Sequence, residues 1–489
     1  MTRLRLAAAA LLLAGTPLYA ASEPDGVGAD QMVMTHHGNP EAGGHFLRGL
    51  ALLHSFEYER AADAFVAAQA ADPDWVMPYW GEAMTHNHPV WFRQDRDAAI
   101  AALAKLGATA EARAAKVRGA DEAVWMGAVE LLFGEGEKEA RDDAYLAHMQ
   151  DLLAANPGDI DLRAFTGLAM LGTAHEGRDI PTYMRAAAIL EPAYSAHEMH
   201  PGVLHYLIHS YDDPVHAPLG LRAAERYAKV APDAGHAQHM VSHIFTALGM
   251  WDDAEAANIN ADAVVDRQRE AAGRPEAACG HYNEWLIYAQ LQQGKDVSGR
   301  VDACRAQAEA ALADGNPGVS WSYAISAVRE GATTGRWPTA LEWTDEQRGP
   351  PLFFVHYGQA LAAREDATAA NAAVAEMEAI LAALKAEPDA FGEGMAWMDR
   401  MVAQAKAVAF LAEGKTEQGL EALASAGEAE AALPVIFGPP MMARPSYEIL
   451  GDELAALGRT DEARVAYEKS LAFAPGRLLT LRGLAALGN

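Results

Sequence analysis

Two short stretches of the chain place histidines where a single helix face can bind an ion. LHYLIHSYDD begins at residue 204 and QHMVSHIFTA at residue 238, and each carries two histidines four residues apart in an apolar run. On an α-helix this spacing puts both imidazoles on one face, about 6 Å apart along the axis. Imidazole suits zinc, copper, iron and nickel, whereas calcium and magnesium prefer oxygen. His239 and His243 follow His205 and His209 at one interval of 34 residues, which indicates a structural repeat.

The same 34-residue period governs both ends of the chain. With Gly49 at position 8 of a unit that begins at Ala42, positions 20, 24, 27 and 32 hold Ala61, Phe65, Ala68 and Pro73. From Arg444 the pattern returns at positions 4, 7, 8, 11, 15, 20, 24 and 32 with Tyr447, Leu450, Gly451, Leu454, Gly458, Ala463, Tyr467 and Pro475. Paired helices need small residues to approach, an aromatic to fill the gap and a proline to end the second helix. On these residues the chain resembles exported bacterial tetratricopeptide-repeat proteins, many of them without an assigned activity.

The resemblance implies an all-α fold, a right-handed solenoid of helix-turn-helix repeats. Turns between paired helices are predicted at 248–254, 292–296, 333–340 and 412–419, and irregular loop insertions near 89–120, 172–201, 211–219 and 427–445. No alternating pattern is long enough to add a sheet. We expect a signal peptide at 1–20, an N-terminal segment at 21–41 that can cross the groove, the solenoid at 42–434, and a breaker-rich loop with the last repeat at 435–489.

In tetratricopeptide repeats the first helix of each unit lines the concave groove, through positions 2, 5, 9, 12 and 13. With Gly249 at position 15, His236, His239 and His243 take positions 2, 5 and 9. In the preceding unit, His205 and His209 take positions 5 and 9. Because neighbouring helices pack about 8–10 Å apart, the two pairs are predicted to form two walls of one metal site.

Further candidates extend this histidine stripe along the groove. In the following unit His281 takes position 2 and Glu284 position 5. Residues 197–243 contain eight of the eighteen histidines, a concentration that favours a functional role over the structural role of a single groove histidine. Toward the N-terminus the candidates are His54, His88, Glu82 with His86, and His36 with His37 on the N-terminal segment. Structural or surface roles are assigned to His148, His197, His216 and His356.

The donor types favour copper, with zinc second and iron third. Methionines near the stripe add soft sulfur, which suits copper, although methionine also packs in cores. The methionines are Met32, Met34, Met84 and Met240. A carboxylate-bridged di-iron centre is disfavoured because its helices carry Glu-x-x-His. Copper with an open position permits oxidase or oxygenase chemistry, and with zinc Glu82 or Glu284 is a candidate general base for metal-bound water.

Three hypotheses for function follow. The first is a metalloenzyme, oxidoreductase rather than hydrolase, that activates oxygen or water beside a small-molecule or peptide substrate in the groove. The second is a scaffold that binds a peptide or a partner protein, as repeat proteins commonly do. The third is metal storage or delivery without turnover. Neither GxSxG nor HExxH occurs, and GKT at 414–416 lacks the first glycine of a phosphate loop, because position 409 is Ala409.

Composition restricts partners and compartment. Arg3 and Arg5, the apolar run at 6–15 and the small residues Ala20 and Ala21 predict a cleaved secretory signal, and hence a periplasmic or secreted protein. No later stretch approaches about 18 uninterrupted apolar residues, so no membrane span is expected. The formal charge of −29 makes nucleic acid an unfavourable partner.

Cys279 and Cys304 are the two cysteines. Export favours a disulfide between them. Their unequal distances from the turn at residues 294–295 oppose one, if both lie on straight helices. The sequence leaves the bond open, and without a CxxC it does not support a redox motif.

Overall fold

The fold is a stack of antiparallel helix pairs. A computed structural model describes residues 26–316, 318–337, 341, 349–386, 394–434 and 436–488. The described residues form an all-α solenoid of tetratricopeptide-like repeats, in which each helix packs mainly on its neighbours in sequence. The expectations for the signal peptide and for residues 21–25 lie outside the described residues, as does Val435.

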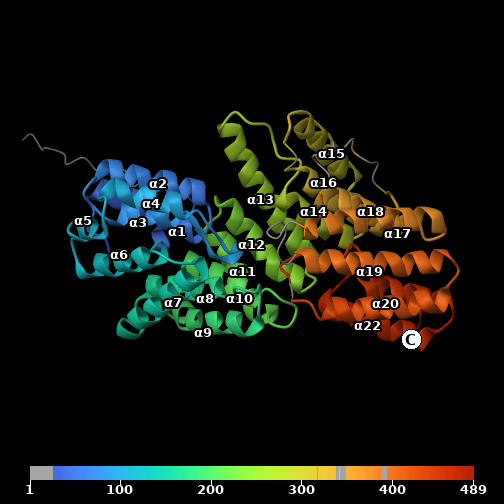
Figure 1. The fold of residues 1–489 in the computed structure, drawn as a ribbon. Coiled ribbons are helices and arrows are strands. Elements are labelled where there is room, and N and C mark those ends of the chain that lie inside the picture. Colours follow the sequence, from blue (N-terminus) through green and yellow to red (C-terminus); the bar gives the residue numbers. More distant parts are fainter. Residues whose placement is uncertain are drawn as a thin grey trace, which may run out of the picture.

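The first half of the stack runs from blue to green in Figure 1. Its helices are α1 (Pro40–His54), α2 (Tyr58–Ala71), α3 (Met77–Met84), α4 (Arg96–Leu106), α5 (Ala110–Ala114), α6 (Ala120–Leu132), α7 (Lys138–Ala155), α8 (Ile160–Gly172), α9 (Ile180–Ala196), α10 (Pro201–Tyr211), α11 (Ala217–Val230) and α12 (Gly235–Ala247). Two short 3-10 helices, η1 (Ala29–Gln31) and η2 (Pro89–Trp91), and a small hairpin of β1 (Asn87–His88) and β2 (Arg93–Gln94) complete it. Because α1 also contacts α10, this half curls back on itself.

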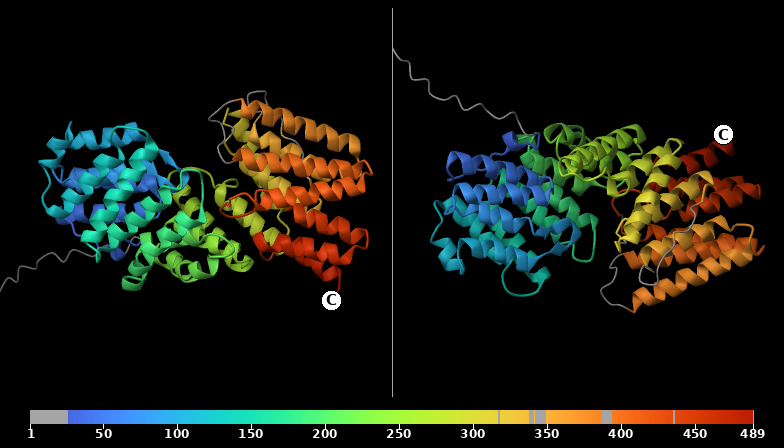
Figure 2. Two further views of the ribbon diagram at one scale, coloured as in Figure 1. Left: turned by 60° about the horizontal axis from the view of Figure 1, so that its bottom comes forward. Right: turned by 90° about the horizontal axis from the view of Figure 1, so that it is seen from above.

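The second half carries the remaining helices. They are α13 (Trp251–Ala271), α14 (His281–Gln292), α15 (Ser298–Ala313), α16 (Ser320–Thr334), α17 (Pro350–Ala362), α18 (Ala367–Lys385), α19 (Gly394–Ala412), α20 (Thr416–Ala431), α21 (Ser446–Ala456), α22 (Thr460–Phe473) and α23 (Leu478–Ala486). The last helix, α23, returns to contact α14. Figure 2 shows the two halves as separate bodies joined through the yellow-green helices around α12 to α14.

The predicted repeat positions act as the pattern requires. A Cβ on Gly49 would lie 2.8 Å from the Phe65 ring, and one on Gly451 would lie 2.5 Å from the Tyr467 ring, so glycine lets each first helix approach its partner. The predicted turns hold glycines with positive φ, which side-chain-bearing residues rarely adopt. These are Gly249, Gly294, Gly335, Gly414 and Gly458.

One predicted feature differs from the structure, and the structure decides one that the sequence left open. The regions near 89–120 and 172–201, expected as irregular loops, are largely helical, because they contain α4, α5 and α9. The disulfide left open by the sequence is present, with the Cα atoms of Cys279 and Cys304 4.6 Å apart. Cys279 precedes α14 in a loop instead of lying on a straight helix, so it can reach α15.

Among the described helices, α18 alone has the length and apolar composition of a membrane span. It packs against α17 and α19 within the stack. A packed helix of a repeat protein meets the same two criteria, so this observation is weak support for a membrane role.

A buried charge network fixes the breaker-rich loop before α21. Arg477 is 1% exposed; its Nε donates to Glu448 at 2.6 Å and its Nη2 donates to the carbonyl of Ala443 at 2.8 Å. Arg444 Nε donates to the same carboxylate at 2.9 Å. These two cations, although burial opposes them, lower the pKa of Glu448 to about 2. The loop at residues 436–445 is therefore held from its C-terminal side.

A second buried glutamate beside this network shifts in the opposite direction. Burial raises the pKa of Glu430 to about 7, although the backbone N–H of Ser446 donates to its carboxylate at 3.0 Å. The folded state therefore prefers neutral Glu430, whereas it prefers ionised Glu448.

Amide substitutions of these two glutamates should have opposite effects on thermal stability. E448Q removes the carboxylate that pairs with buried Arg477 and one of the two carboxylates that pair with Arg444, so it should cost about 3–5 kcal/mol at pH 7. E430Q removes the loss of stability that comes from burying an ionisable carboxyl. This loss is small below pH 4.5, grows as the carboxyl ionises in the unfolded state, and reaches its full value above pH 7. At pH 8 E430Q should stabilise the fold by on the order of 2–3 kcal/mol. Thermal unfolding from pH 4.5 to 8 measures both, and a pH-independent E430Q difference would contradict the burial argument.

Candidate metal centre

The candidate centre lies at the junction of the two halves (Figure 1), where α10 packs on α12 and His281, the first residue of α14, has its ring centroid 4.6 Å from that of His239. Helix α10 begins with Pro201, and the Nδ1 atom of His200 accepts a hydrogen bond from the Val203 N–H at 3.3 Å. From this start, His205 and His209 fall one turn apart on one face. Helix α12 places His239 and His243 in the same way one repeat later.

Three histidines form the first cluster, which we call histidine group A: His205, His209 and His236. One nitrogen from each lies within 4.8 Å of those of the others. His205 and His209 are almost fully buried. Four imidazole nitrogens of this group are buried without a hydrogen-bond partner among the described residues, namely Nε2 of His205, both nitrogens of His209 and Nε2 of His236. Buried polar atoms normally have partners, so the group has unused binding capacity.

The carbonyl of His54 fixes the tautomer of His205. The Nδ1–H of His205 donates to this oxygen at 2.6 Å, and a carbonyl can only accept. In the neutral ring Nε2 therefore carries a lone pair. Burial is the main cause that lowers the pKa of His205, His209 and His236 well below the usual value of 6.5, with neighbouring histidines contributing. The group is therefore a set of neutral donors, as metal binding requires.

Histidine group B consists of His239, His243 and His281, with the same spacing between ligand atoms. The Nδ1–H of His243 donates to the Asp212 carboxylate at 2.6 Å. The Nδ1–H of His239 donates to Oδ1 of Asn258 at 2.7 Å, and this amide is oriented because its Nδ2 donates to the Ala254 carbonyl. Both Nε2 atoms therefore present lone pairs.

Those two Nε2 atoms of His239 and His243 lie 3.2 Å apart. With both protons on Nδ1, neither nitrogen can donate to the other, so the contact brings two lone pairs together. Two nitrogens bound to one tetrahedral zinc ion at 2.0–2.1 Å lie about 3.3–3.4 Å apart. The observed separation is close to this nitrogen–nitrogen distance. The Asp212 carboxylate, which accepts from the other nitrogen of His243, is a usual partner of a metal-bound histidine.

The repeat generates both groups. Each takes positions 5 and 9 of one unit and position 2 of the next, so group B is group A displaced by one unit. The two predicted pairs therefore do not share one three-ligand group; each pair takes its third histidine from the following unit. The groups are neighbours, with ring centroids 6.0 Å apart between His209 and His243 and 6.2 Å apart between His236 and His239.

Aromatic side chains pack against the two groups, although His281 of group B is exposed. Phe56 packs on group A, with its ring centroid 4.3 Å from that of His205, and Trp285 packs on group B, 4.3 Å from His243. Phe437, from the breaker-rich loop, contacts His209 and His243 at 5.6 and 6.1 Å. A segment 228 residues after His209 and 194 residues after His243 in the sequence thus closes the centre.

His54 belongs to a third cluster with Asp161 and His200. Asp161 lies 3.1 Å from His200 Nε2 and 3.6 Å from His54 Nε2, and Nδ1 of His54 is 2.9 Å from the Tyr206 hydroxyl. Burial lowers the pKa of His54 to about 4, whereas the two histidines hold the pKa of Asp161 well below its usual range. The polar atoms of this cluster mostly pair with one another, so we assign the cluster a structural role in packing α1, α8 and α10.

The other predicted residues lie outside these clusters. Glu82 pairs with Lys105 and accepts from Gln69 at 2.7 Å. Glu284 bonds Ser322 and lies near the Arg329 charge. His37 binds Asp121 at 3.0 Å, and His36 packs 5.6 Å from the Trp75 ring.

His86 and His88 line an open cleft of about 1370 Å³ with Tyr58, on which His88 stacks at 4.0 Å. Three histidines that were assigned to structural or surface roles make hydrogen bonds to protein groups. His197 bonds the Gln31 carbonyl, His216 bonds Asp213, and His356 bonds Gln359.

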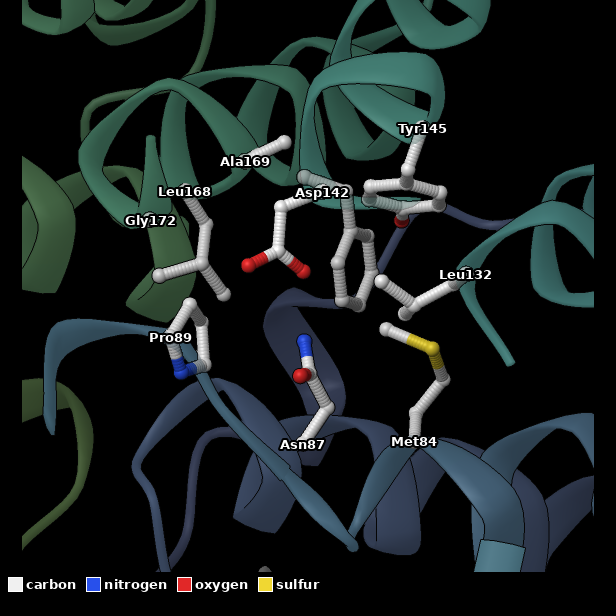
Figure 3. Close-up of a pocket in the computed structure, with 10 residues that line it drawn as sticks. Met84, Asn87, Pro89, Leu132, Asp142, Tyr145, Leu168, Ala169 and Gly172 are labelled. Atoms are coloured by element: carbon white, nitrogen blue, oxygen red, sulfur yellow. The ribbon is translucent and has the colours of Figure 1, made fainter. Parts of the chain in front are cut away.

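A separate small cavity between α3, α7 and α8 is lined mainly by apolar groups (Figure 3). The side chains of Asn87 and Asp142 point toward one another across it, and Met84 lies at its edge. Asp142 is already paired with Lys138 at 2.5 Å. The cavity lining contains no histidine, and we assign it no role in metal binding.

Sequence reasoning missed Asp212 and Asn258, although the repeat register carries a signal for both. Asp212 occupies position 12, which faces the groove. Asn258 occupies position 24, where the terminal repeats place Phe65 and Tyr467, so a fully buried polar residue replaces the usual aromatic.

Comparisons with known proteins add no function. No protein-family model matches the chain, and no curated protein matches its sequence. In fold it is similar to the APC/C hetero-tetramer Cut9–Hcn1 (13% identity, 93% of this chain and 78% of that one, TM-score 0.33). It is also similar to the TPR domain of P58(IPK), with 14% identity over 91% of this chain and 97% of that one and a TM-score of 0.22. A third similar structure is Naa15/Naa10 bound to HypK-THB, with 13% identity over 91% of this chain and 74% of that one and a TM-score of 0.26. At these scores none of them supports a specific function.

Proposed function

We propose that this protein binds two transition-metal ions, one in histidine group A and one in histidine group B. The supporting observation is the convergence of buried lone pairs that have no donor. Within the described part of the chain, Nε2 of His205 and both nitrogens of His209 have no hydrogen-bond partner, and the Nε2 atoms of His239 and His243 face each other at 3.2 Å. A bound cation satisfies these atoms, whereas burial lowers the pKa of His205, His209 and His239 and so opposes their protonation.

Three neutral imidazoles leave a coordination position open, as in catalytic zinc sites, whereas structural sites are closed by four protein ligands. This donor set supports a metal-dependent enzyme that activates water or oxygen. Met32 and Met240 lie in the hydrophobic core and Met84 lines the cavity of Figure 3, so packing accounts for three of the methionines that favoured copper. Copper and zinc therefore both remain candidates, with iron after them.

Two other functions use the same fold. The repeat architecture itself favours a scaffold that binds a peptide or a protein, and the open cleft beside Tyr58 and Arg93 offers a surface for such a ligand. Metal storage or delivery would use the same histidines as an enzyme. The scaffold function predicts no stoichiometric metal, and storage or delivery predicts metal without turnover.

Single substitutions should remove the two ions independently. H209A should lower the metal content of the purified protein from two ions to one per chain, and H243A should do the same, because each residue belongs to one group. H356A, on a histidine bonded to Gln359, is the control and should retain both ions. Elemental analysis with circular dichroism checks content and folding. Equal metal content in all four proteins would count against the assignment, and so would its absence from the wild type.

The carboxylate behind His243 should tune group B alone. Asp212 is 2% exposed, and its carboxylate holds the Nδ1–H of His243. D212N keeps the size of the side chain but weakens this bond, so we expect one of the two ions to bind about 10–100-fold more weakly and the other to be unchanged. Competition with a chromogenic chelator measures both affinities. Weakening of both sites alike would contradict a role confined to group B.

A further inference from the structure

The proposed centre has an unbalanced charge. All six ligands are imidazoles, which carry no negative charge, so none of them offsets the positive charge of a bound ion. The two carboxylates at the end of α10 are already engaged. Asp212 accepts from His243, and Asp213 accepts from the backbone N–H groups of Val215 and His216 and from the His216 ring. Buried charge is costly unless it is paired, so the centre calls for a further anion.

A buried cation with unused donors adds to this excess. Arg178 precedes α9 and is 7% exposed. Its Nη2 reaches Asp213 at the long distance of 3.4 Å, while Nε and Nη1 are buried without a hydrogen-bond partner among the described residues. The guanidinium carbon lies 4.8 Å from the Tyr183 ring and 5.2 Å from the Phe437 ring. Ring faces stabilise the charge but do not accept its in-plane N–H groups.

Arg178 and histidine group A flank one ring. The Phe437 centroid is 5.6 Å from His209 and 5.2 Å from the Arg178 guanidinium carbon. Arg178 and His209 thus contact the same side chain, and a small anion beside Phe437 is the ligand that would join the unused donors of Arg178 to the open position of a group A ion.

We propose that Arg178 and the metal ion of histidine group A together bind a small oxyanion, with a carboxylate as the favoured form. Arginine N–H groups match carboxylate and phosphate oxygens in charge and geometry. The inference rests on the proposed function, because the ion supplies the second contact. Under this inference the ligand of the centre is an anion. It is also small, because the rings of Phe56 and Phe437 both pack against His209 of group A.

The experiment uses the full chain loaded with Co²⁺, whose visible absorption reports its ligands. Acetate and inorganic phosphate are titrated separately at constant ionic strength into wild type, R178Q, R178K and R185Q. Arg185 contacts Thr182 on the same helix region and is the matched control for loss of charge. We expect a saturable spectral change in the wild type and in R185Q, at least tenfold weaker anion binding in R178Q, and partial recovery in R178K, with cobalt stoichiometry unchanged.

The outcomes separate the two proposals. Failure of the wild type to take up cobalt would overturn the proposed function and this inference with it. Two ions per chain with no saturable response to either anion, or with equal affinity in R178Q and wild type, would overturn the inference alone. Tighter binding of phosphate than acetate with the same dependence on Arg178 supports the oxyanion site and assigns it to phosphate. If R178Q loses its helical circular dichroism, the test becomes the anion affinity of R178K compared with that of the wild type, and weaker binding is expected in R178K.

Discussion

The central constraint in this structure is that imidazole lone pairs are buried where no donor among the residues that the structure describes meets them. His205, His209 and His236 point unpartnered nitrogens into one small volume, and His239 and His243 bring two lone pairs within 3.2 Å. Hydrogen bonds to a carbonyl, a carboxylate and an oriented amide hold the opposite nitrogens of three rings. Their protons cannot move to relieve the crowding without breaking these bonds, and a metal ion relieves it directly.

The rest of the fold positions this centre. The 34-residue repeat brings position 2 of one unit beside positions 5 and 9 of the unit before, and so it forms the same three-histidine arrangement twice. The curl of the first half brings α1 against α10, which places the His54 carbonyl behind His205. The breaker-rich loop, anchored through Arg477 and Glu448, closes the centre with Phe437. Helices distant in sequence are thus needed to complete a site whose ligands lie within 77 residues.

Much of this arrangement follows from the sequence, because a repeat converts spacing into position. The glycine, alanine and aromatic pattern around Phe65 and Tyr467 predicts the paired helices, and the register predicts that the histidines at positions 2, 5 and 9 share one face. The register does not specify how far adjacent units are shifted along one another. This shift is what brings position 2 of one unit beside positions 5 and 9 of the unit before, and so gives each pair its third histidine. Long-range closure has no local signal either, which is why Asp161, Phe437 and Arg178 were not predicted. The disulfide depended on Cys279 lying in a loop, which helical periodicity does not specify.

The most direct test of the central claim is X-ray absorption spectroscopy of the purified protein after metal loading and removal of excess ion. The account predicts two ions per chain, each with about three imidazole nitrogens near 2.0 Å, the multiple-scattering pattern of histidine rings, and no sulfur ligand. Zinc and copper would both give this first shell, with one additional light-atom ligand at the open position. Metal bound through sulfur or carboxylate oxygen alone, or no stoichiometric metal, would contradict it.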